Sequence, residues 1–287
     1  MSPEETAAID AELKAWRQGD VILTDIWRSV HVAHMGSPGT QASEDLAADL
    51  ETAGEPLDLQ VVAVDAPGFM LVSQTCDIVR SCAHRPYVEV CPLQPIPADK
   101  VAHVRGGRMT RYLWSPALGA DLLAADLDHV TTLEKAALVR FAADRTPING
   151  TDAEARALAS ALGRKRSRAA LPDDFVALMQ PLQSRISEKH NKLTEEGAFL
   201  RAMAEIRVQP LQGWAAELVD VELFLILDPA AAVPEKADER LDALLKLVKA
   251  SGRFQSVEAR IVTLDSITAA TYVASDRLDL EGLSEGG

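Results

Sequence analysis

The spacing of apolar residues changes twice along the chain, and these changes limit the folds that it can adopt. Between residues 57 and 130 the apolar stretches are short, and the gaps hold Pro67-Gly68, Pro92, Gly106-Gly107 and Pro116. Short strands separated by such turns are typical of a small barrel or a strongly bent sheet. We expect strands over residues 57–64, 69–72, 87–91, 109–114 and 122–130.

From residue 133 to about residue 208 the apolar period becomes helical. Phe175, Met179, Leu182 and Ile186 recur at helical spacings and predict one amphipathic helix. Pro181 lies inside this pattern, so we expect a kink or a break there. Further helices are predicted over residues 151–162 and 194–204.

The last eighty or so residues return to mixed structure. Residues 218–227 are almost wholly apolar, which predicts a central strand covered on both faces. An amphipathic helix over residues 235–250 and a strand over 257–261 follow. The fold class is therefore α+β. We predict three parts: a helix plus a β-barrel-like (SH3-like) domain over residues 1–132, a helical segment over 133–206, and a small α/β unit with an acidic tail over 207–287.

The first residues predict a helix, because Ser2 and Glu5 form a capping box and Pro3 takes the first helical position. Residues 34–56 are rich in glycine, proline and acidic residues. We expect a surface excursion there, with one short helix over residues 46–50.

Composition limits the classes of function. Hydrophobic residues make up 47% of the 287 residues, which predicts a folded core. No apolar run is long enough to span a bilayer, and the acidic start lacks the features of a signal peptide, so we expect a cytoplasmic protein without a membrane partner. The formal charge is −14, which disfavours nucleic acid unless a local basic patch exists. The odd number of cysteines predicts reduced thiols.

The segment Ser73-Gln74-Thr75-Cys76-Asp77 directly follows a predicted strand, a common place for functional side chains. Cys76 could act as a nucleophile with Asp77 and Ser73 as polar neighbours. Against this, an adjacent carboxylate raises the pKa of a thiol, and no histidine is placed by sequence as a base. The alternative is a buried cysteine at a strand end, with Asp77 capping the next turn.

Two metal sites are also conceivable here. Cys76, Cys82, His84 and Cys91 are ligands of the kind that tetrahedral zinc uses, although no Cys-x-x-Cys pair is present. Asp65, Asp77 and Glu89 lie on or beside neighbouring predicted strands and could converge on Mg²⁺. We otherwise expect no resident cofactor.

A basic cluster, Arg164, Lys165, Arg166 and Arg168, follows a predicted helix in this acidic chain. It could hold a phosphate-bearing ligand or a nucleic-acid backbone. Arg185, Lys189, His190 and Lys192 could extend it. Alternatively, these cations stabilise a helix end and pair with carboxylates at the surface.

Three segments carry a resemblance to known proteins: Gly19-Asp20-Val21-Ile22, residues 70–79 and residues 168–173. They resemble a core found in functionally uncharacterised bacterial proteins, some of them encoded among mobile or phage-defence genes. The Gly-Asp-Val start of the first strand is also similar to the barrel of MazF/PemK-type toxins, which cleave RNA. No Arg-Pro pair precedes Val72-Ser73, and the chain is more than twice as long as those toxins, so the likeness implies a barrel more than a nuclease.

Because the sequence holds no strong catalytic motif, the leading hypothesis is an accessory or binding protein. Its ligand would be a partner protein or a phosphate-bearing molecule, in a phage-defence or toxin-like system. The first alternative is an enzyme that uses the Cys76/Asp77 loop, either a thiol-dependent hydrolase or a nuclease. The second alternative is a structural module stapled by zinc.

Overall fold

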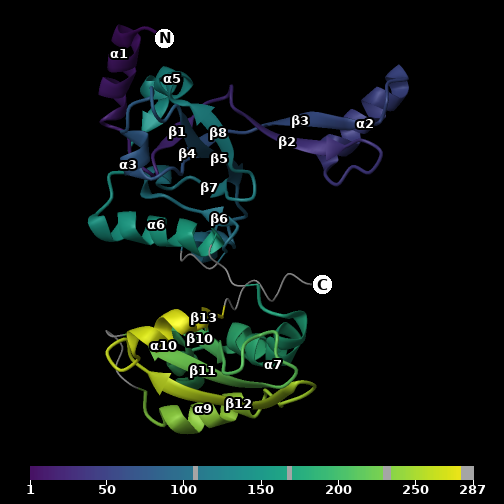
Figure 1. Ribbon diagram of the computed structural model, residues 1–287, viewed down its shortest axis with the longest axis vertical. Helices are drawn as coiled ribbons and strands as arrows, with labels where there is room; N and C mark the ends of the chain where they lie inside the picture. Colours follow the sequence, from purple (N-terminus) through teal and green to yellow (C-terminus); the bar gives the residue numbers. More distant parts are fainter. Residues whose placement is uncertain (106–108, 167–169, 229–233, 279–287) are drawn as a thin grey trace. The chain divides into compact units, whose positions relative to one another are not determined.

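The structure, a computed structural model, describes residues 1–105, 109–166, 170–228 and 234–278, apart from the side chains of residues 102 and 103. The chain divides into two compact units, Met1–Arg166 and Ser167–Gly287 (Figure 1). Both contain helices and strands, so the α+β class is confirmed. The predicted helical segment 133–206 is not one part, because its first helices belong to unit 1 and its last two to unit 2. Among the described residues, no helix is long and apolar enough to cross a membrane.

Unit 1 contains short elements joined by tight turns. In chain order they are α1 (Pro3–Leu13), β1 (Val21–Leu23), β2 (Arg28–His34), α2 (Gln41–Ala53), β3 (Leu59–Asp65), β4 (Gly68–Leu71), α3 (Thr75–Ile78), β5 (Tyr87–Pro95), α4 (Val101–Arg105), β6 (Tyr112–Leu113), the 3₁₀ helix η1 (Pro116–Leu118), β7 (Leu123–Asp126), β8 (Thr131–Glu134), α5 (Lys135–Leu138), the 3₁₀ helix η2 (Val139–Asp144), β9 (Arg145–Thr146) and α6 (Asp152–Arg166). The capping box predicted for α1 is present. Residues 106–107, predicted as a turn, lie outside the described residues.

The main sheet of unit 1 is open. Its strand order is β6-β7-β5-β4-β1-β9, and β8 pairs with β5. Neighbouring strands in it are antiparallel, and β5 is long enough to pair with β8 and β4 along one half and with β7 along the other. Over the residues that the structure describes, no pairing joins β6 to β9. The domain predicted as β-barrel-like (SH3-like) over residues 1–132 therefore shows no closed barrel among the described residues, and both end strands of its sheet are only two residues long.

The Gly19-Asp20-Val21 segment anchors this sheet. Gly19 has φ +91°, and its carbonyl accepts a hydrogen bond from the buried Ser115 hydroxyl at 2.7 Å. The fully buried Asp20 carboxylate accepts hydrogen bonds from the backbone N–H of Arg17 at 3.0 Å and of Ile148 at 2.8 Å. Burial raises the pKa of Asp20. The Gly19-Asp20-Val21 segment therefore joins α1 and β1 to the segment after β9.

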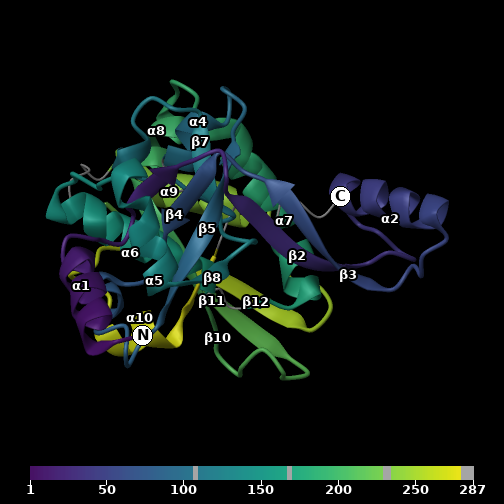
Figure 2. The ribbon, with the colours of Figure 1, turned by 90° about the horizontal axis from the view of Figure 1, so that it is seen from above.

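An arm of residues 28–65, made of β2, α2 and β3, leaves unit 1 between β1 and β4 (Figures 1 and 2). It begins and ends at one place, because β1 pairs with β4 through Leu23 and Gly68, and the Thr24 N–H donates to the Pro67 carbonyl at 3.1 Å. The predicted surface excursion is confirmed, but its helix is longer than expected. The helix is α2, which packs its apolar side chains on the hairpin of β2 and β3.

Unit 2 is a four-stranded sheet of order β12-β11-β10-β13 with helices packed on it. Its elements are α7 (Asp173–Lys189), α8 (Glu195–Arg201), β10 (Met203–Pro210), β11 (Val219–Leu227), α9 (Ala237–Leu245), β12 (Phe254–Val262), α10 (Ala269–Ala274) and β13 (Asp276–Arg277). The predicted central strand is confirmed as β11, which pairs with β10 antiparallel and with β12 parallel. Helix α7 passes through the exposed Pro181 without ending there.

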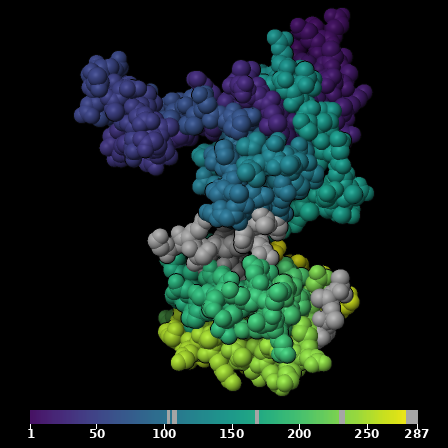
Figure 3. All heavy atoms as spheres, turned by 180° about the vertical axis from the view of Figure 1, so that it is seen from behind, coloured from purple at the N-terminus to yellow at the C-terminus, as the bar shows by residue number. Residues whose placement is uncertain are grey.

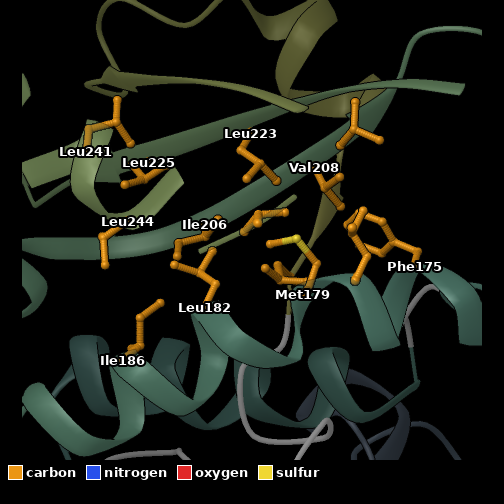
Figure 4. Packing of buried hydrophobic residues seen from close by; sticks show 14 of the residues in the cluster. Phe175, Met179, Leu182, Ile186, Ile206, Val208, Leu223, Leu225, Leu241 and Leu244 are labelled. Atoms are coloured by element: carbon orange, nitrogen blue, oxygen red, sulfur yellow. The ribbon is translucent and has the colours of Figure 1, made fainter. Parts of the chain in front are cut away.

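One apolar core holds unit 2 together (Figure 4). Phe175, Met179, Leu182 and Ile186 of α7 point at the sheet, as their spacing predicts. Leu241 and Leu244 of α9 join the same cluster. Burial of such side chains is worth roughly 1.5–3 kcal/mol each, so this core supplies most of the stabilisation of unit 2.

Candidate functional site

The segment of residues 73–77 follows β4 and runs into α3, and its two hydroxyl groups make hydrogen bonds that hold its conformation. The Ser73 hydroxyl accepts a hydrogen bond from the backbone N–H of Glu89 in β5 at 2.7 Å. The Thr75 hydroxyl accepts one from the backbone N–H of Gln18 at 3.1 Å. Both hydroxyls therefore fix the loop to neighbouring segments, and Ser73 is engaged in this contact rather than directed at the Cys76 thiol.

Cys76 is exposed, and its Sγ lies 3.6 Å from the side-chain oxygen of Gln74. The alternative of a buried cysteine is therefore wrong for Cys76. The Asp77 carboxylate lies 3.3 Å from the guanidinium of Arg80. Cys82 and Cys91 are buried. Burial raises the pKa of both thiols, that of Cys91 to about 12, so neither is a thiolate at neutral pH.

A buried lysine beneath this loop was not predicted. Lys135 is fully buried, and its ammonium donates hydrogen bonds to the carbonyl oxygens of Asp77 at 2.8 Å and Arg80 at 2.6 Å. Burial lowers the pKa of Lys135, although the charge of Asp10 opposes this change. Lys135 therefore fixes the turn that carries Cys76. A single lysine at the start of the predicted helical segment has no sequence signal that distinguishes it from a surface residue.

The four predicted zinc ligands do not converge. Cys76 and His84 are exposed, whereas Cys91 lies in an apolar core cluster of unit 1. Cys82 is buried beside α1, and its backbone N–H donates to Asp10 at 2.8 Å. Across the residues that the structure describes, no group of three or more His, Cys, Asp or Glu side chains could hold a metal ion.

The carboxylates of the predicted Mg²⁺ site lie in different places. Asp65 is on the arm and pairs with Arg28 at 2.8 Å. Glu89 is on β5 and pairs with Arg166 at 2.8 Å. Asp77, the third, contacts Arg80 as described above. Each of the three carboxylates is therefore engaged with a different arginine.

Arg164, Lys165 and Arg166 of the basic cluster lie in the last turn of α6. Lys165 forms an ion pair with Asp128, and Arg166 pairs with Glu89. These two cations also line a small depression of about 140 Å³, together with Leu127, Val130 and Leu162. Arg164 is half-buried, and Arg168 lies outside the described residues. The pairing of Lys165 and Arg166 agrees with the alternative of cations neutralised at the surface.

The second basic group belongs to unit 2. Arg185 makes a two-point contact with Glu196 at 2.7 and 2.9 Å, and Lys189 pairs with Glu188. Arg185, Lys189 and Lys192 line an open concavity of about 650 Å³. Glu195 and Glu196 line the same concavity, so acidic side chains stand among its cations. His190 is only partly exposed and contacts Asn191.

The arm carries an apolar face that the sequence analysis did not identify. In the hairpin, Val30 pairs with Ala63, Val32 with Val61, and His34 with Leu59. Alternate residues point to the same side of a sheet, so these pairs share one face. Val30, Val32, Leu59 and Val61, which we call the apolar face, are 45%, 67%, 63% and 66% exposed. Residues 57–64 were expected to form a strand, but residues 28–34 were not expected to form its partner, so the shared face could not be predicted.

Helix α2 covers the opposite face of the hairpin. Val62 is buried there against Met35 and Ala47. The helix therefore leaves the apolar face uncovered, and Figure 3 shows the atoms of the arm standing clear of the rest of unit 1. The arm is also acidic, because residues 28–65 hold seven carboxylates, one arginine and no lysine.

No match was found when the chain was compared with protein-family models, with curated proteins and with solved structures. Function therefore has to be inferred from these residues. Among the features above, the apolar face combines a large exposed apolar area with a rigid, hydrogen-bonded support.

Proposed function

We propose that this protein is a binding protein that docks a partner protein on the apolar face of its arm. The observation that carries the proposal is the exposure of four aliphatic side chains on one side of a regular hairpin, whose two strands have seven residues each. Contiguous apolar patches of this kind on a folded surface mark interaction sites. Aliphatic residues scattered singly would need no such explanation.

The free energy gained by covering the apolar face is in the range that a specific protein contact needs. Full burial of one Val or Leu side chain contributes roughly 1.5–3 kcal/mol. The four side chains are on average about three-fifths exposed. Covering them would therefore supply on the order of 4–7 kcal/mol, before the entropic cost of association. This amount is enough for binding if polar contacts at the rim add to it.

Site-specific photo-crosslinking tests this proposal. A photoreactive residue at position 32 should give an adduct with one cellular protein, whereas the same residue at position 273, where Val273 is 82% exposed in unit 2, should not. The captured protein is then purified and its affinity for the full chain measured. The double variant Val32→Thr/Val61→Thr should bind it at least about tenfold more weakly, since threonine keeps the shape of valine and loses apolar surface. Equal binding of wild type and double variant would refute the proposal.

One observation favours the enzyme alternative as a second candidate. Cys76 is exposed on a turn that Lys135 fixes from below, so the thiol is both accessible and held in place. If this turn is catalytic, Cys76→Ala abolishes activity in a cell-based assay without lowering the melting temperature. A variant that keeps full activity would exclude the thiol from any reaction.

Four predictions from the sequence remain: the ligand of the basic cluster, the type of barrel in unit 1, the cellular location and the biological pathway. A phosphate-bearing ligand at Arg164, Lys165 and Arg166 stays a prediction, and the depression beside Lys165 supports it. We also propose that unit 1 is an open relative of the SH3-like barrel and of the MazF/PemK toxins, supported by its short antiparallel strands. A cytoplasmic location and a role in a phage-defence or toxin-like system are part of the same proposal.

A further inference from the structure

We propose that the partner supplies an extended, positively charged segment that pairs as a third strand along the outer edge of β3. This inference rests on the proposed function, because it specifies how a partner occupies the arm. It is supported by the state of the hairpin edges, by the difference between the two strands and by the charge of the arm.

Both edges of the hairpin are open in the described part of the chain. Strands β2 and β3 form a separate two-stranded sheet, and their seven paired positions run without a register shift. Natural proteins protect exposed edges with lysine, proline or a bulge. Neither strand contains lysine or proline. An unprotected regular edge beside an apolar face is the arrangement that accepts an added strand.

The edge of β3 is more accessible than that of β2. Six of the seven residues of β3 are exposed, and Val62, the exception, points at α2. In β2, Ser29 is buried, and the ring of His31 lies 6.1 Å from that of His129 in the body of unit 1. A strand added next to β3 therefore meets no neighbouring element among these contacts, whereas His129 stands beside β2.

The charge of the arm selects a cationic occupant. Seven carboxylates lie in residues 28–65, and six of them fall between residues 44 and 58, on or just after α2. Helix α2 covers the side of the hairpin opposite the apolar face. An added strand would therefore place alternate side chains toward the apolar face and the others toward the acidic helix. The matching pattern is apolar residues alternating with Lys or Arg.

The same charges disfavour a second copy of this chain as the occupant. Two copies would bring two arms together, each with seven carboxylates and one arginine, and each chain carries a formal charge of −14. Like charges in an interface oppose association. A partner of opposite charge gains from the field that repels a second copy.

Fluorescence anisotropy with the full-length protein tests the inference. The probe is a labelled seven-residue peptide that alternates Val and Lys, matched in length to β3. The control peptide has Glu in place of each Lys. We expect saturable binding of the Lys peptide, at least about tenfold tighter than that of the Glu peptide, and weakened by salt. Equal affinities, or no binding of the Lys peptide, would overturn the inference.

Backbone pairing is tested with two N-methylated forms of the Lys peptide. One carries methyl groups on its odd amides and the other on its even amides, so that only one form blocks the hydrogen bonds to β3. We expect one form to lose binding and the other to keep it. Equal behaviour of both forms would overturn strand addition. Val61→Thr should weaken the Lys peptide severalfold, whereas Val273→Thr in unit 2 should not change its affinity.

The two proposals fail in different ways. If the crosslinked cellular partner binds through Val32 and Val61 but the peptides do not bind, strand addition is wrong and the proposed function stands. If the Thr variants do not affect the partner, the proposed function is wrong. A concentration-dependent dimer in sedimentation equilibrium that Val32→Thr/Val61→Thr abolishes would show that a second copy occupies the face, which overturns both.

Discussion

Substitution of Gly68 by alanine should destabilise unit 1 strongly. Gly68 opens β4 opposite Leu23 with φ +143°, a region that residues with a side chain rarely adopt. A Cβ atom there would lie 1.9 Å from the carbonyl oxygen of Ile22, which belongs to the backbone of β1 and cannot rotate away. The backbone conformation costs roughly 1–3 kcal/mol, and relief of the overlap costs a further 1–3 kcal/mol or so. We expect a total loss of about 2–6 kcal/mol in the free energy of unfolding.

The control is Gly119→Ala, because Gly119 also has positive φ (+56°), and an added Cβ atom would meet nothing within 4 Å beyond its chain neighbours in the described residues. Gly119 has ψ −120°, outside the left-handed helical region, so this variant carries a conformational cost alone and should lose roughly 1–3 kcal/mol. Urea unfolding followed by tryptophan fluorescence measures both, with Trp16 and Trp27 reporting on unit 1 and Trp214 on unit 2. In a unit of this size the Gly68 variant should melt about 10 °C lower. Equal losses in the two variants would refute the steric argument.

Three further predictions concern buried and paired side chains. Lys135→Met should lower the stability of unit 1 by roughly 2–4 kcal/mol, because two carbonyl oxygens lose their donor. Burial lowers the pKa of Lys135 in the folded state, so the unfolded chain holds more protons at pH values between the two pKa values. The stability of wild type relative to Lys135→Met should therefore rise with pH in that alkaline window, and a fall in urea titrations would contradict this. In alkylation read by mass spectrometry, Cys76 should react within minutes while Cys91 stays unmodified until unfolding, and equal rates would contradict the burial. Arg166→Glu should change stability by no more than about 1 kcal/mol, since its pair with Glu89 is exposed, so a larger loss would indicate a structural role.

Local rules predicted several elements correctly because the local pattern and the tertiary packing favour the same structure there. The helix at Pro3–Leu13 follows from its cap, and β11 follows from a run of apolar residues that only a covered strand can satisfy. The apolar stripe of α7 was visible as a period. By contrast, β2 was not predicted. Val30 and Val32 alternate there with histidines, and apolar residues are not the majority in the strand.

The candidate site was harder to predict, because it depends on which residues meet. The segment around Cys76 was predicted as a candidate site, but the exposure of Cys76 could not be read from the residues around it. Lys135 reaches the 73–77 loop across 58 positions of sequence, and Asp20 reaches Ile148 across 128. The apolar face exists because β3 pairs with β2 while α2 covers the other side. Such pairings are set by tertiary packing, which a single sequence does not display.

The chain leaves the body of unit 1 and returns to it at one place, so the arm could be replaced by another segment. Leu23 pairs with Gly68, and the Thr24 N–H donates to the Pro67 carbonyl, so the backbone pairing of β1 with β4 is complete without residues 28–65. Trp27, which packs on Phe69, lies before the arm and stays with the body of unit 1. The entropy of closing such a connection grows only slowly with its length. Arms of other lengths and surfaces could therefore be grafted at this junction while the body stays intact. A lineage of such proteins could change what it recognises by replacing about forty residues and leaving the scaffold as it is.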